Sequence, residues 1–205
     1  DKDAPIKFIV LKIQNHSNRT RRMSATGYVE WVLGDMRSKY QMHTITEMDI
    51  RSGSILAKNA YSPEFERRSA FFDVNDDNRT FTTDRAEFIG RNGTLANPEA
   101  MNRTKLSGKI GAALDPCAAL QVSFELAEEE EKEIIFRLGA GKNINDTLAI
   151  IRLFEGTLAA KNSLEKVKKY WEETLTAVQI ETPDTATNIL TNGWLNYQTL
   201  ACRIW

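Results

Sequence analysis

The stretch AALQVSFEL at residues 118–126, followed by KEIIFRL at residues 132–138, decides the fold class. Both segments combine apolar and β-branched residues over the length of a single strand. The acidic run AEEEE at residues 127–131 separates them and predicts a solvated turn, so the sequence favours a β-hairpin. Because carboxylates at such a tip splay outward, the run is not expected to bind a metal ion.

Further short strands precede this pair along the chain. Asn, Asp, Gly and Ser interrupt the apolar segments at intervals of about ten residues, which is typical of an antiparallel sandwich or barrel. The sequence therefore predicts a mainly β fold, an antiparallel β-sandwich over residues 1–141. The additional strands are expected at residues 6–13, 28–31, 44–50, 54–58, 69–73, 79–83 and 106–110.

After residue 141 the apolar period changes from 2 to 3.6, which indicates helices over residues 142–205. Either Asn143 or Asn145 can cap a first short helix, and Gly156 closes it. A second helix is expected to begin near Asn162, where Glu165 completes a capping-box-like pair.

A third helix is expected to begin at Thr182, which precedes a proline at a first-turn position. Gly193 lies inside this helix and is expected to permit a close helix contact. Its apolar stripe, which includes Trp194 and Tyr197, is uninterrupted up to Trp205. Because no stop signal follows the stripe, we expect the chain to be the front part of a longer protein.

Composition excludes several classes of protein. A net charge of -1 argues against nucleic-acid binding, although Arg19, Arg21 and Arg22 form a local basic cluster. Cys117 and Cys202 lie far apart and are expected to be buried free thiols in a reducing, cytoplasmic compartment. Two isolated histidines supply no metal site, and no apolar run is long enough to cross a membrane.

Four dense segments together resemble family-94 glycoside hydrolases. The branch they resemble most is the phosphorylase region of cyclic β-1,2-glucan synthases and the related 1,2-β-oligoglucan phosphorylases. The resemblance covers nearly the whole chain, and it departs at residues 127–131, where relatives often have Pro-Gly. The segments are GYVEWVLG at 27–34, TDRAEFIGRNG at 83–93, LDPCAALQ at 114–121 and WLNYQTLACRIW at 194–205.

The resemblance implies a super-sandwich of the galactose-mutarotase type, followed by linker helices and an (α/α)6 barrel. It also implies that the catalytic Asp belongs to the barrel, beyond residue 205, so no catalytic residue is expected here. Family members cleave a β-glucosidic bond with inversion, and inorganic phosphate takes the place of the attacking water. No cofactor is implied. The implied partners are the barrel of the same polypeptide, a β-glucan and a second subunit in a homodimer.

The best candidate for substrate contact is the polar segment around Asp84, Arg85, Glu87, Arg91 and Asn92. Such side chains hydrogen-bond sugar hydroxyls, and the resemblance implies that this domain contributes to the rim of an active site. The competing interpretation is a loop held by an internal Arg–carboxylate pair. The glycine that ends the segment, at position 93, is expected to need a positive φ.

Two other readings compete with that of a non-catalytic accessory domain. The chain could be a free-standing carbohydrate-binding sandwich, or a structural spacer that never contacts glucan. Tyr28 and Trp31 could stack on a sugar, but aromatic residues alternating in a strand are more often part of the core.

Overall fold

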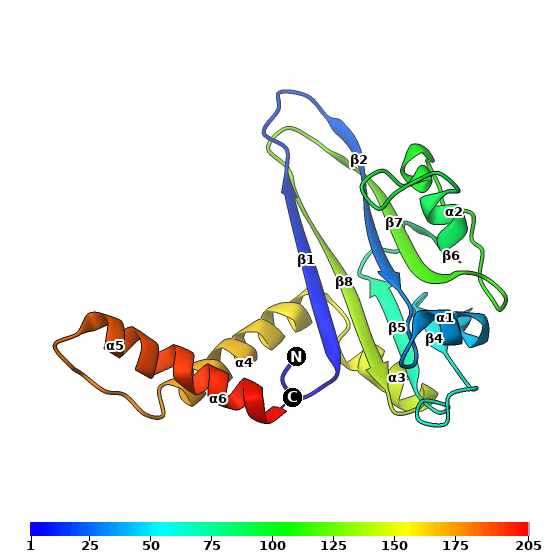
Figure 1. Cartoon of the computed structure of the whole chain (residues 1–205). Helices are drawn as coiled ribbons and strands as arrows, with labels where there is room; N and C mark the ends of the chain where they lie inside the picture. Colours follow the sequence, from blue (N-terminus) through cyan, green and yellow to red (C-terminus); the bar gives the residue numbers. More distant parts are fainter. Residues whose placement is uncertain (205) are drawn as a thin grey trace. The chain divides into compact units, whose positions relative to one another are not determined.

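The computed structural model describes residues 1–204, and residues 4–160 form a compact unit made of two antiparallel sheets (Figure 1). The mainly β sandwich predicted from the sequence is confirmed. The five-stranded sheet has the order β1 (Ile6–Gln14), β8 (Glu131–Gly141), β5 (Ser69–Val74), β4 (Ile55–Lys58) and β3 (Ile45–Met48). The three-stranded sheet has the order β2 (Arg21–Glu30), β7 (Pro116–Leu126) and β6 (Arg79–Asp84).

The main core lies between the inner faces of the two sheets. Phe72 and Phe136 stack there with ring centroids 5.8 Å apart, and Leu120 of the other sheet belongs to the same cluster. Gly27 of β2 leaves room for these rings, because a Cβ at this position would lie 2.5 Å from Phe136. Trp31 is also part of this core, as predicted from its alternation.

The predicted hairpin is wrong, because β7 and β8 lie in different sheets. β8 pairs with β1 and β5, whereas β7 pairs with β2 and β6. Residues 127–130 therefore form a corner at which the chain changes sheet. A second corner at residues 15–20 connects β1 to β2 (Figure 1).

Asn15 joins these two corners. Its buried side-chain amide donates to the carbonyl oxygens of Arg19, Leu126 and Ala127 at 2.9, 3.0 and 2.9 Å. Its backbone bonds to the other corner as well, since its N–H donates to Glu130 O and its carbonyl accepts from Glu129 N–H. The positive φ of Glu129, 56°, belongs to this turn.

The segment 106–110, predicted as a strand, forms none. Only single bonds tie it to β6, such as Gly108 N–H to Phe81 O at 2.8 Å and Thr83 N–H to Lys109 O at 2.9 Å. It therefore runs along the free edge of β6 as irregular chain, where it places Ser107 and Lys109 near the end of that strand.

Helix α3 (Ile144–Leu153) covers the outer face of the five-stranded sheet and builds a second core with Ile6 and Phe71. Asn143 is its N-cap, accepting from Asp146 N–H at 3.0 Å, which selects one of the two predicted caps. At its other end Arg137 donates to the carbonyl oxygens of Ile151 and Phe154 and pairs with buried Asp73.

Short helical segments complete the 4–160 unit. They are α1 (Arg37–Tyr40), η1 (Gln41–His43), α2 (Arg85–Ile89) and η2 (Glu99–Asn102). The predicted domain division at residues 141 and 142 stays a prediction.

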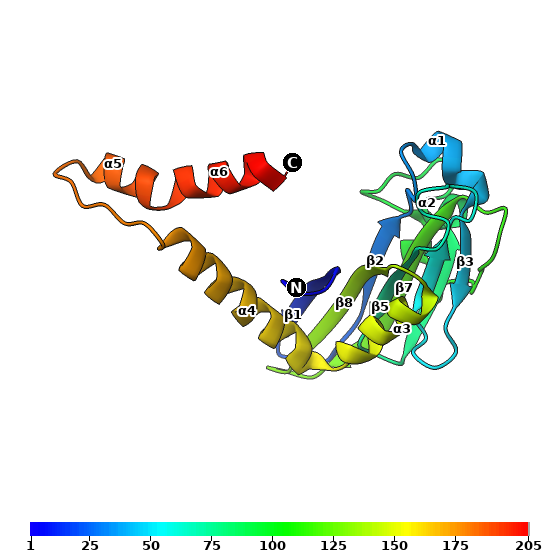
Figure 2. The same ribbon diagram turned by 90° about the horizontal axis from the view of Figure 1, so that it is seen from below.

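The remaining described residues, 1–3 and 161–204, form a second, helical unit. It contains most of α4 (Thr157–Leu175), then α5 (Thr185–Ile189), a π-helical turn η3 (Leu190–Trp194) and α6 (Leu195–Ile204). Figure 2 shows α5 and α6 running on in line through that turn. No helix within residues 1–204 is long and apolar enough to cross a membrane.

Three details of the helices differ from prediction. Asn162 lies inside α4 rather than capping it, and Asp184 rather than Thr182 caps α5, accepting from Ala186 and Thr187 N–H groups. Gly193 makes no close helix contact among the described residues, since nothing lies within 4 Å of a Cβ built on it. The stripe predicted to end at Trp205 reaches a residue outside the described part of the chain.

Candidate functional site

Asp84 begins the candidate segment, which is a short helix rather than a loop. Its carboxylate caps α2, accepting from Ala86 N–H at 3.1 Å, and receives the ammonium of Lys109 at 3.0 Å. The pKa of the Lys109 ammonium is raised because it donates to Asp84. Asp84 is buried, so its carboxylate is committed to holding the end of β6 and the start of α2.

Arg85 belongs to a four-membered ion-pair cluster. Its Nε donates to Glu30 Oε1 at 2.8 Å, and its second contact is Asp115 Oδ2 at 3.3 Å. Arg37 spans the same two carboxylates from α1, at 2.8 Å to Glu30 Oε2 and with a close contact to Asp115 Oδ1. Two arginines thus face two carboxylates, and the cluster balances its own charge.

The environment of this cluster keeps Glu30 ionised. Partial burial raises the pKa of Glu30, but hydrogen bonds from Arg85 and Tyr28 outweigh burial and hold the pKa below its ordinary value. Burial, followed by the hydrogen bond to Glu30, raises the pKa of Tyr28, whose hydroxyl donates at 2.8 Å. Its ring stacks on Phe88 of α2 with centroids 4.6 Å apart, as a core residue would.

Glu87 is also fully engaged. Its Oε2 accepts from Thr82 Oγ1 at 3.1 Å and from Ser107 Oγ at 2.6 Å, and its Oε1 accepts from Arg103 at 3.0 Å. Its side chain is 7% exposed. Glu87 therefore ties α2 to the chain that follows it, around residues 103–109.

Arg91 and Asn92 differ from the first three candidates because both are exposed and neither has a side-chain hydrogen bond within the described residues. The positive φ lies at Gly90, 84°, not at Gly93 as predicted. Gly93 is instead required because a Cβ there would lie 1.8 Å from the carbonyl oxygen of Ile89. The tight turn leaves Arg91 and Asn92 free to contact another molecule.

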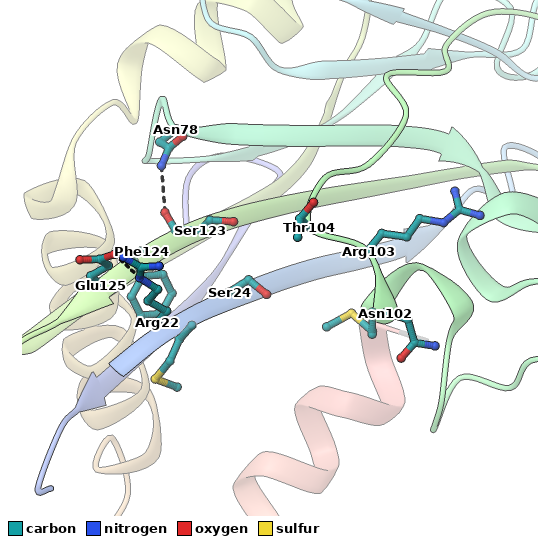
Figure 3. Close-up of a pocket in the computed structure, with 11 residues that line it drawn as sticks. Arg22, Ser24, Asn78, Asn102, Arg103, Thr104, Ser123, Phe124 and Glu125 are labelled. Carbon is teal, nitrogen blue, oxygen red and sulfur yellow. Dashed lines mark hydrogen bonds and ion pairs between the residues drawn. The ribbon is translucent and has the colours of Figure 1, made fainter. Parts of the chain in front are cut away.

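An open hollow of about 610 Å³ lies on the outer face of the three-stranded sheet, next to this segment. Figure 3 shows Ser24 of β2, Ser123 of β7 and Thr104 around its centre. Arg103, which also pairs with Glu87, belongs to its lining and connects it to α2. Arg22 and Glu125 close one end with a hydrogen bond of 2.6 Å (Figure 3).

The chemistry of this region is that of a held surface rather than of acid–base catalysis. A general acid needs a carboxyl whose pKa is raised, whereas Glu30 has a lowered pKa and Asp84 and Glu87 each accept from a cation. Within residues 1–204, no three His, Cys, Asp or Glu side chains are grouped to hold a metal ion.

Sequence reasoning found Asp84, Arg85 and Glu87 but missed the cluster that Arg85 joins. Glu30 and Asp115 stand 55 and 30 residues away from it in sequence. A signal was nevertheless present, because the cluster draws on three of the dense segments, those at 27–34, 83–93 and 114–121. Arg37 lies outside them and carries no sequence signal of its own.

Comparison with known proteins defines the class. Residues 1–157 match the family described as glycosyl hydrolase 94, supersandwich domain, so the chain belongs to this family and the resemblance predicted from its dense segments is confirmed.

Individual relatives follow from the same comparison. The chain is 34% identical over 201 residues to the cyclic beta-(1,2)-glucan synthase NdvB of Rhizobium meliloti (strain 1021), and the alignment covers 98% of the chain. It is 25% identical over 214 residues to the N,N'-diacetylchitobiose phosphorylase of Vibrio proteolyticus, covering 99% of the chain. The cellobionic acid phosphorylase of Neurospora crassa is 23% identical over 195 residues, covering 92% of the chain.

The chain is much shorter than these relatives. It spans 7% of the length of the glucan synthase, 25% of the length of the Vibrio phosphorylase and 24% of the length of the Neurospora enzyme.

Proposed function

We propose that this chain is the non-catalytic sandwich portion of a longer β-1,2-glucan-active phosphorylase or cyclic glucan synthase. In that polypeptide it supports a helical catalytic barrel, and inorganic phosphate is the co-substrate of an inverting phosphorolysis. The observation that carries the proposal is the state of the carboxylates. Glu30, Asp84 and Glu87 are all neutralised by cations within the sandwich, which leaves them to hold structure and not to transfer protons.

Within this role, the candidate segment divides into two parts. Asp84, Arg85 and Glu87 fix α2 to the sheet and to residues 103–109. Arg91 and Asn92, exposed at the end of that rigid helix, are the side chains that would contact glucan hydroxyls. A contact made from a fixed helix end is pre-organised, so little conformational entropy is lost on binding.

The test places Arg91→Ala in the polypeptide that also contains the barrel. We expect a raised KM or a lowered turnover with β-1,2-gluco-oligosaccharides and phosphate. The matched control is Arg67→Ala, because Arg67 is exposed and its only ion pair is a weak one with its neighbour Glu66 at 3.8 Å. Unchanged kinetics for Arg91→Ala would remove the glucan contact and leave a structural role for the segment.

A free-standing carbohydrate-binding module is the alternative, and the hollow on the three-stranded sheet favours it. Ser24, Asn102, Thr104 and Ser123 line it, and their side-chain polar groups have no hydrogen-bond partner in the described part of the chain. Isothermal titration of the chain with β-1,2-gluco-oligosaccharides separates the two functions. The accessory role predicts no detectable binding, whereas millimolar or tighter binding would support the module.

A cytoplasmic location, expected from the free cysteines, is part of the same proposal. Phosphate-dependent release of sugar phosphate by the chain alone would refute the non-catalytic role.

A further inference from the structure

The sandwich is open along one side, where β1 ends the five-stranded sheet and β2 ends the three-stranded sheet. In the described part of the chain no strand lies beyond either of them, and Figure 1 shows β1 with β8 on one flank only. A hollow of about 470 Å³ lies between the ends of these two strands, lined by Ile13 of β1 and Met23 of β2. The gap between the sheets is therefore not closed at this side.

Apolar side chains are exposed at this opening. Ile9, Val10 and Leu11 of β1 are 42%, 46% and 38% exposed, and Met23 of β2 is 40% exposed. Long apolar edge strands are rare in monomers, because unpaired N–H and C=O groups beside apolar side chains recruit another strand.

The inward direction of Ile9 and Leu11 follows from register. They are opposite Phe136 and Ile134 of β8, which both belong to the core between the sheets. Phe8, on the other face of β1, packs against the outer core with α3. Ile9 and Leu11 thus continue the inner core up to an edge where it stops.

We propose that a second copy of this chain closes this side, with β1 pairing antiparallel to β1 of its partner about a two-fold axis perpendicular to the sheet. Such an axis keeps inner faces together, so each residue must face one of the same parity. Lys7 and Lys12 have opposite parity and never oppose each other. A register centred on Val10 places Ile9 opposite Leu11, Lys7 opposite Ile13 and Phe8 opposite Lys12.

The charges of β1 fit this pairing. Lys12 already lies 3.6 Å from Glu133 and 4.0 Å from Glu131 of β8 on its own sheet. It therefore brings a neutralised charge to the interface. The same axis brings the two β2 edges toward each other, so Met23 of both copies can cover the exposed Ile9 and Leu11. The edge is self-complementary in shape of pattern as well as in charge, and this pairing does not rest on the proposed glucan activity.

The experiment measures the oligomeric state of the 205-residue chain by sedimentation equilibrium. We expect a dimer at roughly 10 μM protein, and Ile9→Lys combined with Leu11→Lys should weaken it at least ~100-fold. The matched control is Ile50→Lys, since Ile50 is 97% exposed away from this edge, and it should leave the dimer unchanged. Circular dichroism should show that all three variants keep the sandwich.

Cross-linking tests the register directly. In a Cys202→Ser background, Val10→Cys should form an intermolecular disulfide if the axis passes through position 10, because facing Cα atoms lie about 4.5–5.5 Å apart and a disulfide spans that distance. Ile50→Cys should not cross-link. A monomer at these concentrations would overturn the proposal and leave the edge to a strand of another polypeptide. A dimer insensitive to the β1 lysines, or an open-ended assembly, would also overturn it.

Discussion

Asn15→Ala should be among the more damaging single substitutions in the sandwich, because this side chain ties together the two corners at which the chain changes sheet. The alanine removes the amide bonds to Arg19, Leu126 and Ala127. It also removes the acceptor for Ser17, which donates from its N–H at 3.1 Å and from its hydroxyl at 2.6 Å.

The magnitude follows from how much of this is buried. Asn15 is 6% exposed, and its bond to Leu126 O is buried, so water cannot replace it. A net hydrogen bond contributes about 1 kcal/mol, and a buried group left unsatisfied costs about 1–3 kcal/mol. With two or three bonds lost beyond solvent reach, we expect the free energy of unfolding to fall by about 2–4 kcal/mol.

The assay is urea unfolding followed by circular dichroism, with hydrogen exchange of β7 and β8 amides to assign the loss to the sandwich. Asn78→Ala is the matched control, since its amide makes one exposed bond, to Ser123 O at 2.9 Å. It should cost less than about 1 kcal/mol. If Asn15→Ala cost no more than Asn78→Ala, the two corners would be held by their backbone bonds alone and the reasoning would be refuted.

Three further outcomes are expected. Because the pKa of Glu30 is held below its ordinary 4.5, its ion pairs stabilise the fold above that pH and are lost as pH falls; Glu30→Gln should lower stability at pH 7 by about 1 kcal/mol and flatten the acid limb of an unfolding series, whereas an unchanged limb would contradict this. Burial raises the pKa of the Cys117 thiol, so iodoacetamide at pH 8 should alkylate exposed Cys202 and spare Cys117 until the chain is unfolded, as peptide mass spectrometry can check. Gly193→Ala should stabilise the helical unit by up to about 1 kcal/mol, since a Cβ there meets open space; a lower melting temperature would show that the π-helical turn needs glycine.

Strand positions could be predicted from the sequence because burial at each strand imposes its own pattern. Ser69–Val74 is buried throughout and β6 was expected within one residue of its true end. Strand partners could not be predicted in the same way. Four residues between β7 and β8 suit a tight hairpin and a corner between sheets equally well, and the choice depends on Asn15, more than a hundred residues away.

The candidate site shows the same division. The dense polar segment at 83–93 was recognisable, but local sequence does not distinguish a side chain that is free from one that is paired across the fold. Arg85 is paired through Glu30 and Asp115, while Arg91 is exposed. Cys202 was expected to be buried and is exposed, since a helical stripe predicts which side is apolar and not what covers it.

The pairing of the first strand with the last has a consequence for how the chain is made. Ile6 lies opposite Gly139 and Gln14 opposite Glu131, so β1 has no neighbour until nearly the whole sandwich has left the ribosome. Contacts this distant along the chain slow folding, because a long loop must close before any of them forms. During synthesis the apolar segment IKFIVLKI waits unpaired, which makes it the natural place for a chaperone to bind the nascent protein.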